Sequence, residues 1–305
     1  MKTFLSAVLV TLLVTATGAR AQKAPPSGPQ YHAYSASSGS HANATADEVV
    51  AYSRVIEAVD SATKMRIHFK GHNLGKGSYV RLTSLQDYGR QELNATSMGY
   101  WYDTSAIFNG NRVLLELRVA PGDQGVSCEV DQLVVPCDCG PKVAADTFLA
   151  QTLCGADSRV ASGDNRVGRI NGCTAWLVSN GAVLTAGHCA PLTPGDTFEV
   201  NVPTSTSSGG QVASAPQDQF PINAASAVFV NGGAGNDFCV FSLNPNGGTG
   251  QRAHVQHGFF RMSREIPALA STVRITGFGV DNSPLGPVAN CCATETKLFT
   301  ADAVR

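Results

Sequence analysis

The segment around His188 carries the residue types best suited to acid–base chemistry. His188 follows the small residues Ala186 and Gly187 and precedes Cys189, directly after an apolar run that ends at Thr185. A neutral imidazole can take a proton from a nucleophile when a second group holds its other ring nitrogen. An exposed loop position is the ordinary alternative for a single histidine, so the surrounding pattern decides between the two interpretations.

That pattern resembles the catalytic-histidine segment of chymotrypsin-like serine peptidases. The resemblance rests on the run 185–189, Thr-Ala-Gly-His-Cys, and on Cys173 upstream. It implies that His188 is the general base and acid and that a disulfide joins Cys173 to Cys189. Gly187, which we expect to leave space beside the ring, and the run 155–160, Gly-Ala-Asp-Ser-Arg-Val, resemble the bacterial glutamyl-endopeptidase branch. This branch implies cleavage after acidic residues.

Asp237 is the aspartate that the same resemblance assigns to His188. A carboxylate bonded to the imidazole fixes its tautomer and stabilises the imidazolium that forms. In the family this aspartate lies roughly 40–50 residues after the histidine, at the start of an apolar strand. Asp237 fits, because it begins the alternating run 237–243. Asp196 and Asp218 compete, but both lie in sequence typical of solvated turns. We therefore predict a hydrogen bond between His188 and Asp237.

The sequence lacks the motif that would supply the nucleophile. In this family the serine lies in a Gly-Asp-Ser-Gly or Gly-Asn-Ser-Gly loop, whose backbone amides form the oxyanion hole. The serines after Asp237 are Ser242, Ser263, Ser271 and Ser283, and none of them is followed by glycine. The resemblance therefore implies a chain that stops before its nucleophile loop and that is inactive as it stands. True divergence is the alternative.

The elements that must position these residues fall into two differently patterned parts. Short alternating runs separated by Gly, Asn and Pro turns predict a small β-sandwich, and Gly-rich, strand-punctuated sequence follows it. The expected fold class is all-β: an N-terminal β-sandwich followed by a chymotrypsin-like double β-barrel, truncated, as the resemblance implies. The expected parts are a signal peptide at 1–21, a flexible leader at 22–63 with a possible short helix in 46–62, an accessory or pro domain at 64–140, a linker at 141–155 and an incomplete trypsin-like domain at 156–305.

Composition favours a secreted, β-rich protein. Of the 305 residues, 43% are hydrophobic and 15% charged, and the formal net charge is −1. No basic block occurs, and no run after the signal peptide is long enough to span a bilayer, so we expect neither nucleic-acid nor membrane binding. The expected product is a secreted monomer, and the resemblance to serine peptidases implies that it acts on protein or peptide substrates.

Nine cysteines fit an oxidising compartment. Apart from Cys173 and Cys189, their pairing stays open. Their spacing fits no zinc site, so we expect no metal and no cofactor. Asn43 and Asn94 each begin an Asn-Ala-Thr run, which is a glycosylation acceptor if the host attaches glycans.

Two other functions stay open. The first is a catalytically inactive peptidase homologue that binds protein, although such a scaffold has no need of both His188 and Asp237. The second is a carbohydrate-binding protein in which Tyr100, Trp101 and Tyr102 form a platform for sugars. Aromatic residues in small sandwiches more often pack in the core or at an edge.

Overall fold

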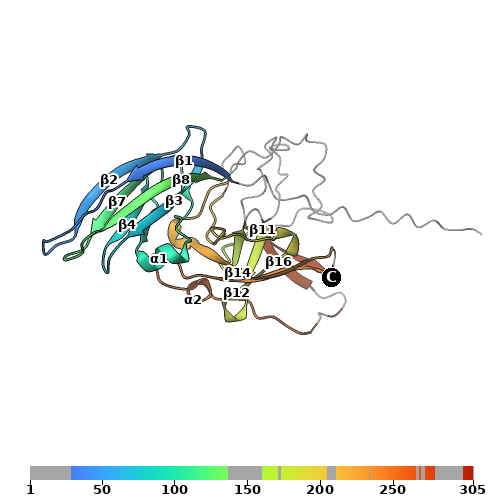
Figure 1. The fold of residues 1–305 in the computed structure, drawn as a ribbon. Coiled ribbons are helices and arrows are strands. Elements are labelled where there is room, and N and C mark those ends of the chain that lie inside the picture. Colours follow the sequence, from blue (N-terminus) through green and yellow to red (C-terminus); the bar gives the residue numbers. More distant parts are fainter. Residues whose placement is uncertain are drawn as a thin grey trace, which may run out of the picture.

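The computed structural model describes residues 29–136, 160–170, 173–204, 211–233, 235–265, 268, 272–278 and 298–304. Figure 1 shows two β-rich units, one built from residues 29–136 and the other from residues after 159. Each has its own hydrophobic core. Phe69 and Trp101 belong to the first, and Phe198 and Phe241 belong to the second. The all-β class expected from the sequence is confirmed.

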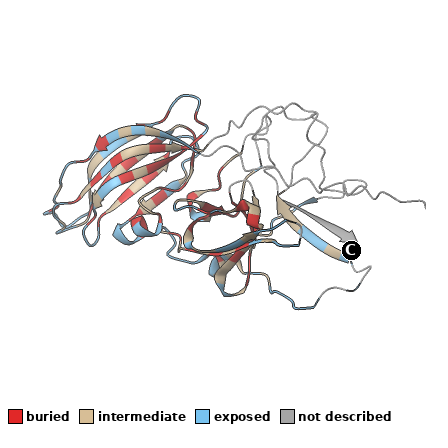
Figure 2. Cartoon of the chain, turned by 45° about the vertical axis from the view of Figure 1, so that its right-hand side comes forward, coloured by how far each residue is buried: buried red, intermediate tan, exposed pale blue. Residues whose placement is uncertain are grey.

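The first unit contains two four-stranded antiparallel sheets, with the orders β1-β8-β3-β6 and β2-β7-β4-β5. Buried and intermediate or exposed residues alternate along β4 and β7, so one face of their sheet lies in the core of this unit (Figure 2). Its elements are β1 Gln30–Ser37, β2 Val49–Glu57, β3 Lys64–Asn73, β4 Tyr79–Ser84, β5 Arg90–Leu93, α1 Ala95–Tyr100, β6 Phe108–Asn109, β7 Arg112–Val119 and β8 Ser127–Val135.

This sandwich starts earlier than the sequence predicts. The flexible leader over 22–63 and its helix in 46–62 are wrong for the residues that the structure describes, because β1 and β2 lie there. Val49, Val55 and Ile56 are β-branched and favour a strand, and β2 pairs with β7 along its length. The register shifts between Val50 and Tyr52. This bulge breaks the two-residue period and makes the run look like a helical face.

Asn43 ties the start of β2 to the end of β7. Its Nδ2 donates to the Asp47 carbonyl at 2.7 Å and to the Val119 carbonyl at 2.9 Å, and its Oδ1 accepts from the Thr45 N–H. The side chain is buried. Asn94, the other expected glycan acceptor, is exposed and caps α1 instead.

The second unit is built around a closed six-stranded barrel with the order β10-β11-β12-β15-β14-β13. Beside it lies a three-stranded sheet, β16-β17-β9, held to β11 where Trp176 Nε1 donates to the Thr276 carbonyl at 2.9 Å. The elements are β9 Val160–Ala161, β10 Val167–Ile170, β11 Cys173–Leu177, η2 Ser179–Gly181, β12 Ala182–Thr185, η3 Gly187–Cys189, β13 Thr197–Glu199, η4 Pro216–Asp218, β14 Gln219–Asn231, β15 Asp237–Leu243, α2 Ala253–His257, β16 Thr272–Phe278 and β17 Leu298–Val304.

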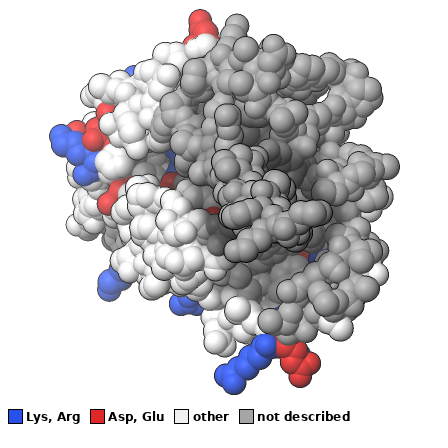
Figure 3. Space-filling model, turned by 90° about the vertical axis from the view of Figure 1, so that its right-hand side faces the viewer, with Lys and Arg blue, Asp and Glu red and all other residues white. Residues whose placement is uncertain are grey.

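The surface agrees with the weak net charge. On the face in Figure 3, the charged side chains of the described residues are scattered and of both signs. Among the same residues, no helix has the length and apolar character needed to cross a membrane.

Candidate active site

The pairing of β12 with β15 brings His188 to Asp237. Thr185, the last residue of β12, is paired with Cys239 near the start of β15. The chain leaves β12 through Ala186 and turns in η3, which carries His188. Asp237 is the first residue of β15. His188 and Asp237 therefore meet where β12 ends and the neighbouring antiparallel strand β15 begins.

Both oxygens of the Asp237 carboxylate face the histidine. Oδ2 lies 2.7 Å from His188 Nδ1, and Oδ1 accepts the His188 backbone N–H at 2.8 Å. The hydrogen bond predicted from the sequence is present. A carboxylate held at two points fixes the orientation of the ring, and it fixes the tautomer with the proton on Nδ1. Nε2 is then the nitrogen able to accept a proton.

The same contacts keep Asp237 ionised. Its pKa is lowered from the ordinary value, chiefly by the hydrogen bond from the His188 side chain, while partial burial opposes the shift. The backbone N–H groups of His188 and Gly187 lower the pKa further. The side chains of His188 and Asp237 both stay partly exposed. This is the electrostatic arrangement that stabilises an imidazolium next to a carboxylate.

The sequence suggests that Gly187 leaves space beside the His188 ring, but in the structure this space is filled. A side chain here would lie 2.7 Å from the Val230 carbonyl carbon and 2.9 Å from Asp237 Oδ1, and closer still to the Val230 oxygen. The position is filled by the backbone of β14. Glycine therefore lets η3 pack directly on β14 and against the carboxylate of Asp237.

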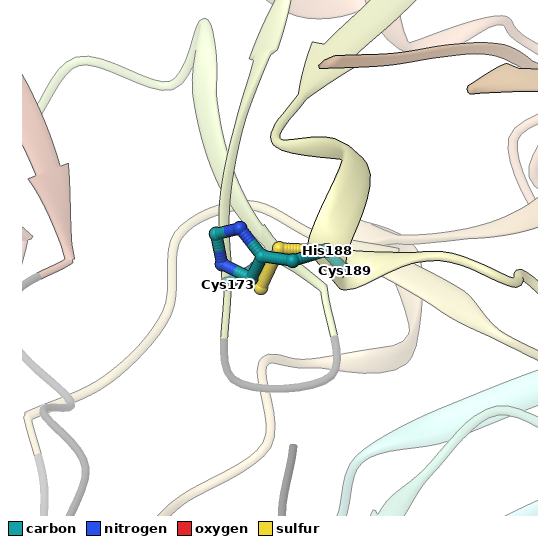
Figure 4. A group of neighbouring side chains, drawn as sticks. All are labelled: Cys173, His188 and Cys189. Atoms are coloured by element: carbon teal, nitrogen blue, oxygen red, sulfur yellow. A yellow bond between two sulfur atoms is a disulfide. The ribbon is translucent and has the colours of Figure 1, made fainter. Parts of the chain in front are cut away.

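A disulfide joins Cys173 to Cys189, and it ties η3 to the start of β11. The two Cα atoms are 6.4 Å apart, within the range that a disulfide spans. Figure 4 shows the bridge directly beside the His188 ring. The three side chains have potential metal ligands close together. The bonded sulfurs are not thiolates, however, so this group does not fit a metal centre.

The competing aspartates have other partners. Asp196 accepts hydrogen bonds from the N–H and the hydroxyl of Thr193, and Asp218 accepts one from Asn201. Both positions agree with the turn roles expected from the sequence.

Cys239, whose pairing the sequence leaves open, lies two residues after Asp237 in β15. The structure describes it as a free and fully buried cysteine. Burial raises the pKa of this thiol. Cys239 is therefore an unreactive part of the barrel core.

Two of the serines that follow Asp237 are described, and both are engaged locally. Ser242 lies within β15, and its hydroxyl bonds to that of Ser226 at 2.9 Å. Ser263 accepts the Glu265 N–H at 3.0 Å. Ser271 and Ser283 lie outside the described residues. Neither described serine lies in a glycine-flanked loop.

The proposed sugar platform is not built as expected. Trp101 is fully buried in the sandwich core, whereas Tyr100 is exposed. Trp101 is therefore a core residue, and it does not share an open face with Tyr100 and Tyr102.

The comparison with known families decides the class of the second unit. Residues 158–290 match the family model described as Trypsin. These residues belong to the trypsin family. The trypsin-family domain thus contains His188, Asp237 and the disulfide, as well as all six strands of the barrel.

Eight chains of solved structures also match. One is a Glu endopeptidase determined in complex with MPD, with 17% identity and a TM-score of 0.34; the match covers 49% of this chain and 69% of that one. No curated protein matches the chain. Family membership implies protein or peptide substrates for the trypsin-family domain.

Sequence reasoning missed the role of Val230 in this trypsin-family site. Its carbonyl fills the space beside Gly187, but a backbone oxygen leaves no trace in the residue type. The small residue at position 187 was the available signal, because a glycine beside a functional side chain indicates close backbone approach.

Proposed function

We propose that the trypsin-family domain is a secreted serine endopeptidase in which His188 is the general base and acid and Asp237 orients it. The observation that carries the proposal is the two-point contact of Asp237 with His188, at 2.7 Å to Nδ1 and 2.8 Å to the backbone N–H. A solvated loop histidine has no need of such a partner. Export is supported by the signal-peptide pattern over residues 1–21 and by the disulfide.

The chemistry is acyl transfer in two steps. A serine oxygen attacks the peptide carbonyl while its hydroxyl proton moves to His188 Nε2, and the resulting imidazolium gives that proton to the leaving amine. Water then repeats the sequence on the acyl-enzyme and releases the acid. Asp237 stays ionised throughout and stabilises the imidazolium through Nδ1.

The proposal places the nucleophilic serine outside these 305 residues. Its support is that no serine after Asp237 lies in a Gly-Asp-Ser-Gly or Gly-Asn-Ser-Gly run. The oxyanion hole belongs to the same loop in this family, so it would be supplied from the same place. A catalytically inactive homologue that binds protein is the second candidate, favoured by the same missing motif.

A serine-reactive fluorophosphonate tests both candidates. The probe reacts with a serine that a histidine activates, so we expect no labelling of the 305-residue chain and strong labelling of any longer product of the same gene. His188→Ala should remove labelling and reduce peptidase activity more than about ten-thousandfold. Asp237→Asn should reduce activity about ten-thousandfold, because the wrong tautomer is favoured.

Asp218→Asn is the matched control, because it removes a carboxylate of the same unit whose hydrogen-bond partner is Asn201 and not the His188 ring. It should keep full activity. Labelling of the 305-residue chain that His188→Ala abolishes would place the nucleophile inside this chain. A gene without any further glycine-flanked serine would select the inactive homologue.

A further inference from the structure

The two units of the chain are joined by buried polar groups, and Gln219 makes the clearest contact. Gln219 is the first residue of β14 and has 0% of its surface exposed. Its Oε1 accepts the Ile107 N–H at 2.8 Å, and its Nε2 donates to the Ile107 carbonyl at 2.8 Å. One side-chain amide of the barrel thus satisfies both backbone groups of a residue next to the edge strand β6 of the sandwich.

Asn109 makes the same kind of contact in the opposite direction. This residue ends β6, and its side chain is buried. Nδ2 donates to the Ala213 carbonyl at 3.0 Å, and Oδ1 accepts the Ala213 N–H at 2.8 Å. Each unit therefore offers one amide side chain that pairs with both backbone groups of a residue in the other. Such reciprocal pairs require a fixed register between the units.

Arg66 on β3 is buried and reaches across to the barrel. Its Nε donates to the Ser105 carbonyl at 2.8 Å, and one terminal nitrogen donates to Thr104 Oγ1 at 3.0 Å. The other terminal nitrogen donates to the Gly195 carbonyl of the barrel unit. The guanidinium also lies 5.8 Å from the centre of the Trp101 ring.

The charges that compensate Arg66 come from the other unit. Burial lowers the pKa of Arg66 to about 10, and Asp196 and Glu199 of the barrel unit oppose this shift. Burial also acts on Glu199 and raises its pKa. The charges of Arg169 and of Lys64 on β3 outweigh this effect together with a backbone hydrogen bond from Ser214, so the pKa of Glu199 is lowered. Two buried cations of the sandwich, Arg66 and Lys64, thus interact with carboxylates of the barrel, although Glu199 also pairs with Arg169 of its own unit at 3.0 Å.

Backbone segments of the two units also approach closely. A side chain at Gly247 would lie 2.6 Å from the Cβ of Ser97, so only glycine fits there. Next to it, Asn244 Nδ2 donates to the Tyr100 carbonyl at 2.9 Å. Three barrel segments, at 195, 213–219 and 244–247, therefore contact the sandwich.

We propose that the sandwich, residues 29–136, is a permanent subunit-like partner of the trypsin-family barrel and stays bound to it when the chain between them is cut. When a pro domain is released on maturation, the enzyme surface that it covered becomes exposed to water, so that surface must be stable without the pro domain. Here separation would open the interface at Gln219 and Ala213, each at most 1% exposed. The sequence left accessory and pro domain as alternatives for this region, and these contacts favour an accessory domain. The inference does not depend on the proposed peptidase activity.

The test uses the whole chain with a recognition sequence for a site-specific protease inserted between residues 145 and 146. Cys137→Ser and Cys139→Ser leave the N-terminal fragment with only Cys128, which is buried, so that no disulfide joins the fragments. After complete cleavage, we expect both fragments to co-elute from a sizing column in 1 M salt, at the volume of the uncut protein. Fragments that elute separately would overturn the proposal.

Amide hydrogen exchange on the cut protein gives a readout that needs no interface variant. The N–H groups of Ile107 and Ala213 donate across the interface, so they should exchange as slowly as in the intact chain. Fast exchange at both positions after cutting would show that the units have come apart.

Gln219→Leu and Gln251→Leu form a matched pair for affinity. Gln219→Leu removes the partner of both backbone groups of Ile107 and of the Ser214 carbonyl within the barrel. It should weaken fragment binding about tenfold or more. Gln251 is exposed, so its variant should bind like the unmodified protein. Equal affinities for the two variants would contradict the role given to Gln219.

Discussion

Gly187 is the residue on which the geometry next to His188 depends most directly. In Gly187→Ala the new Cβ would meet the Val230 carbonyl, and backbone of β14 cannot turn aside as a flexible side chain can. We expect a loss of about 1–3 kcal/mol in the free energy of unfolding, typical of overpacking. Denaturant unfolding measures it.

Gly163→Ala is the control for this prediction. Nothing lies within 4 Å of the side chain that it would add. Its free energy of unfolding should match that of the unmodified protein, and an equal loss in both variants would contradict the steric explanation.

Acid should weaken the contact between His188 and Asp237. The pKa of Asp237 is lowered, so its carboxylate form is the one that the fold stabilises. That contribution is fully present above the ordinary value of 3.8 and is lost as the pH falls through the lower, folded value. We expect the stability difference between the unmodified protein and Asp237→Asn to be constant from pH 5 to about 4 and to shrink below this range.

Unfolding curves at several pH values check this expectation, with Asp60→Asn as an exposed control of equal charge. A stability difference for Asp237→Asn that grows towards acid would contradict it.

For single residues, the sequence predicts the side chains of the candidate site but not the backbone that holds them. His188, Asp237 and the cysteine pair lie in local runs that resemble a family pattern. The Val230 carbonyl and the second contact of Asp237, to the His188 N–H, depend on how η3 packs on β14 and β15. Such contacts involve atoms that every residue has, so no residue type indicates them.

Among the elements, η3 depends on its covalent link to β11. Replacing Cys173 and Cys189 together by alanine opens a loop of 16 residues, which should cost about 3 kcal/mol in the free energy of unfolding. Denaturant unfolding of the double variant measures this cost. An unchanged midpoint and slope would show that the packing of η3 on β14 and β15 holds the histidine without the bridge.

The regular strand β7 could be predicted from its two-residue period, whereas the bulged strands β1 and β2 could not. β7 alternates along its whole length, and the sequence predicts it correctly. β1 and β2 each contain a register shift, between Ala33 and Ala36 and between Val50 and Tyr52. A bulge moves the side chains after it to the opposite face, so the apolar pattern loses its period.

For the whole molecule, the interface predicts that the two units unfold together. The chain has two tryptophans, and each reports on one unit: Trp101 lies in the sandwich core and Trp176 in the barrel. In Trp176→Phe the fluorescence follows the sandwich, and in Trp101→Phe it follows the barrel. We expect each fluorescence transition to coincide with the loss of all secondary structure in the same variant.

Circular dichroism on the same samples measures the loss of all secondary structure. Fluorescence midpoints that separate from the circular dichroism midpoint would mean that each unit is stable by itself.

The arrangement of the two units is the part of the fold that the sequence could least predict. Ile107 and Gln219 are 112 residues apart, and nothing in either residue type indicates a partner. Polar amides such as Gln219 and Asn109 are expected at the surface, and only the docked arrangement explains why they are buried.

The two hydrogen bonds donated by Asn43 have a practical consequence for producing the protein. Asn43 begins an Asn-Ala-Thr run, and in a eukaryotic secretory pathway a glycan attached there would replace an N–H that the fold uses. The modified chain could not bury this side chain between β2 and β7. Export to a bacterial periplasm forms the disulfide without adding the glycan, and it is therefore the expression route that the fold favours.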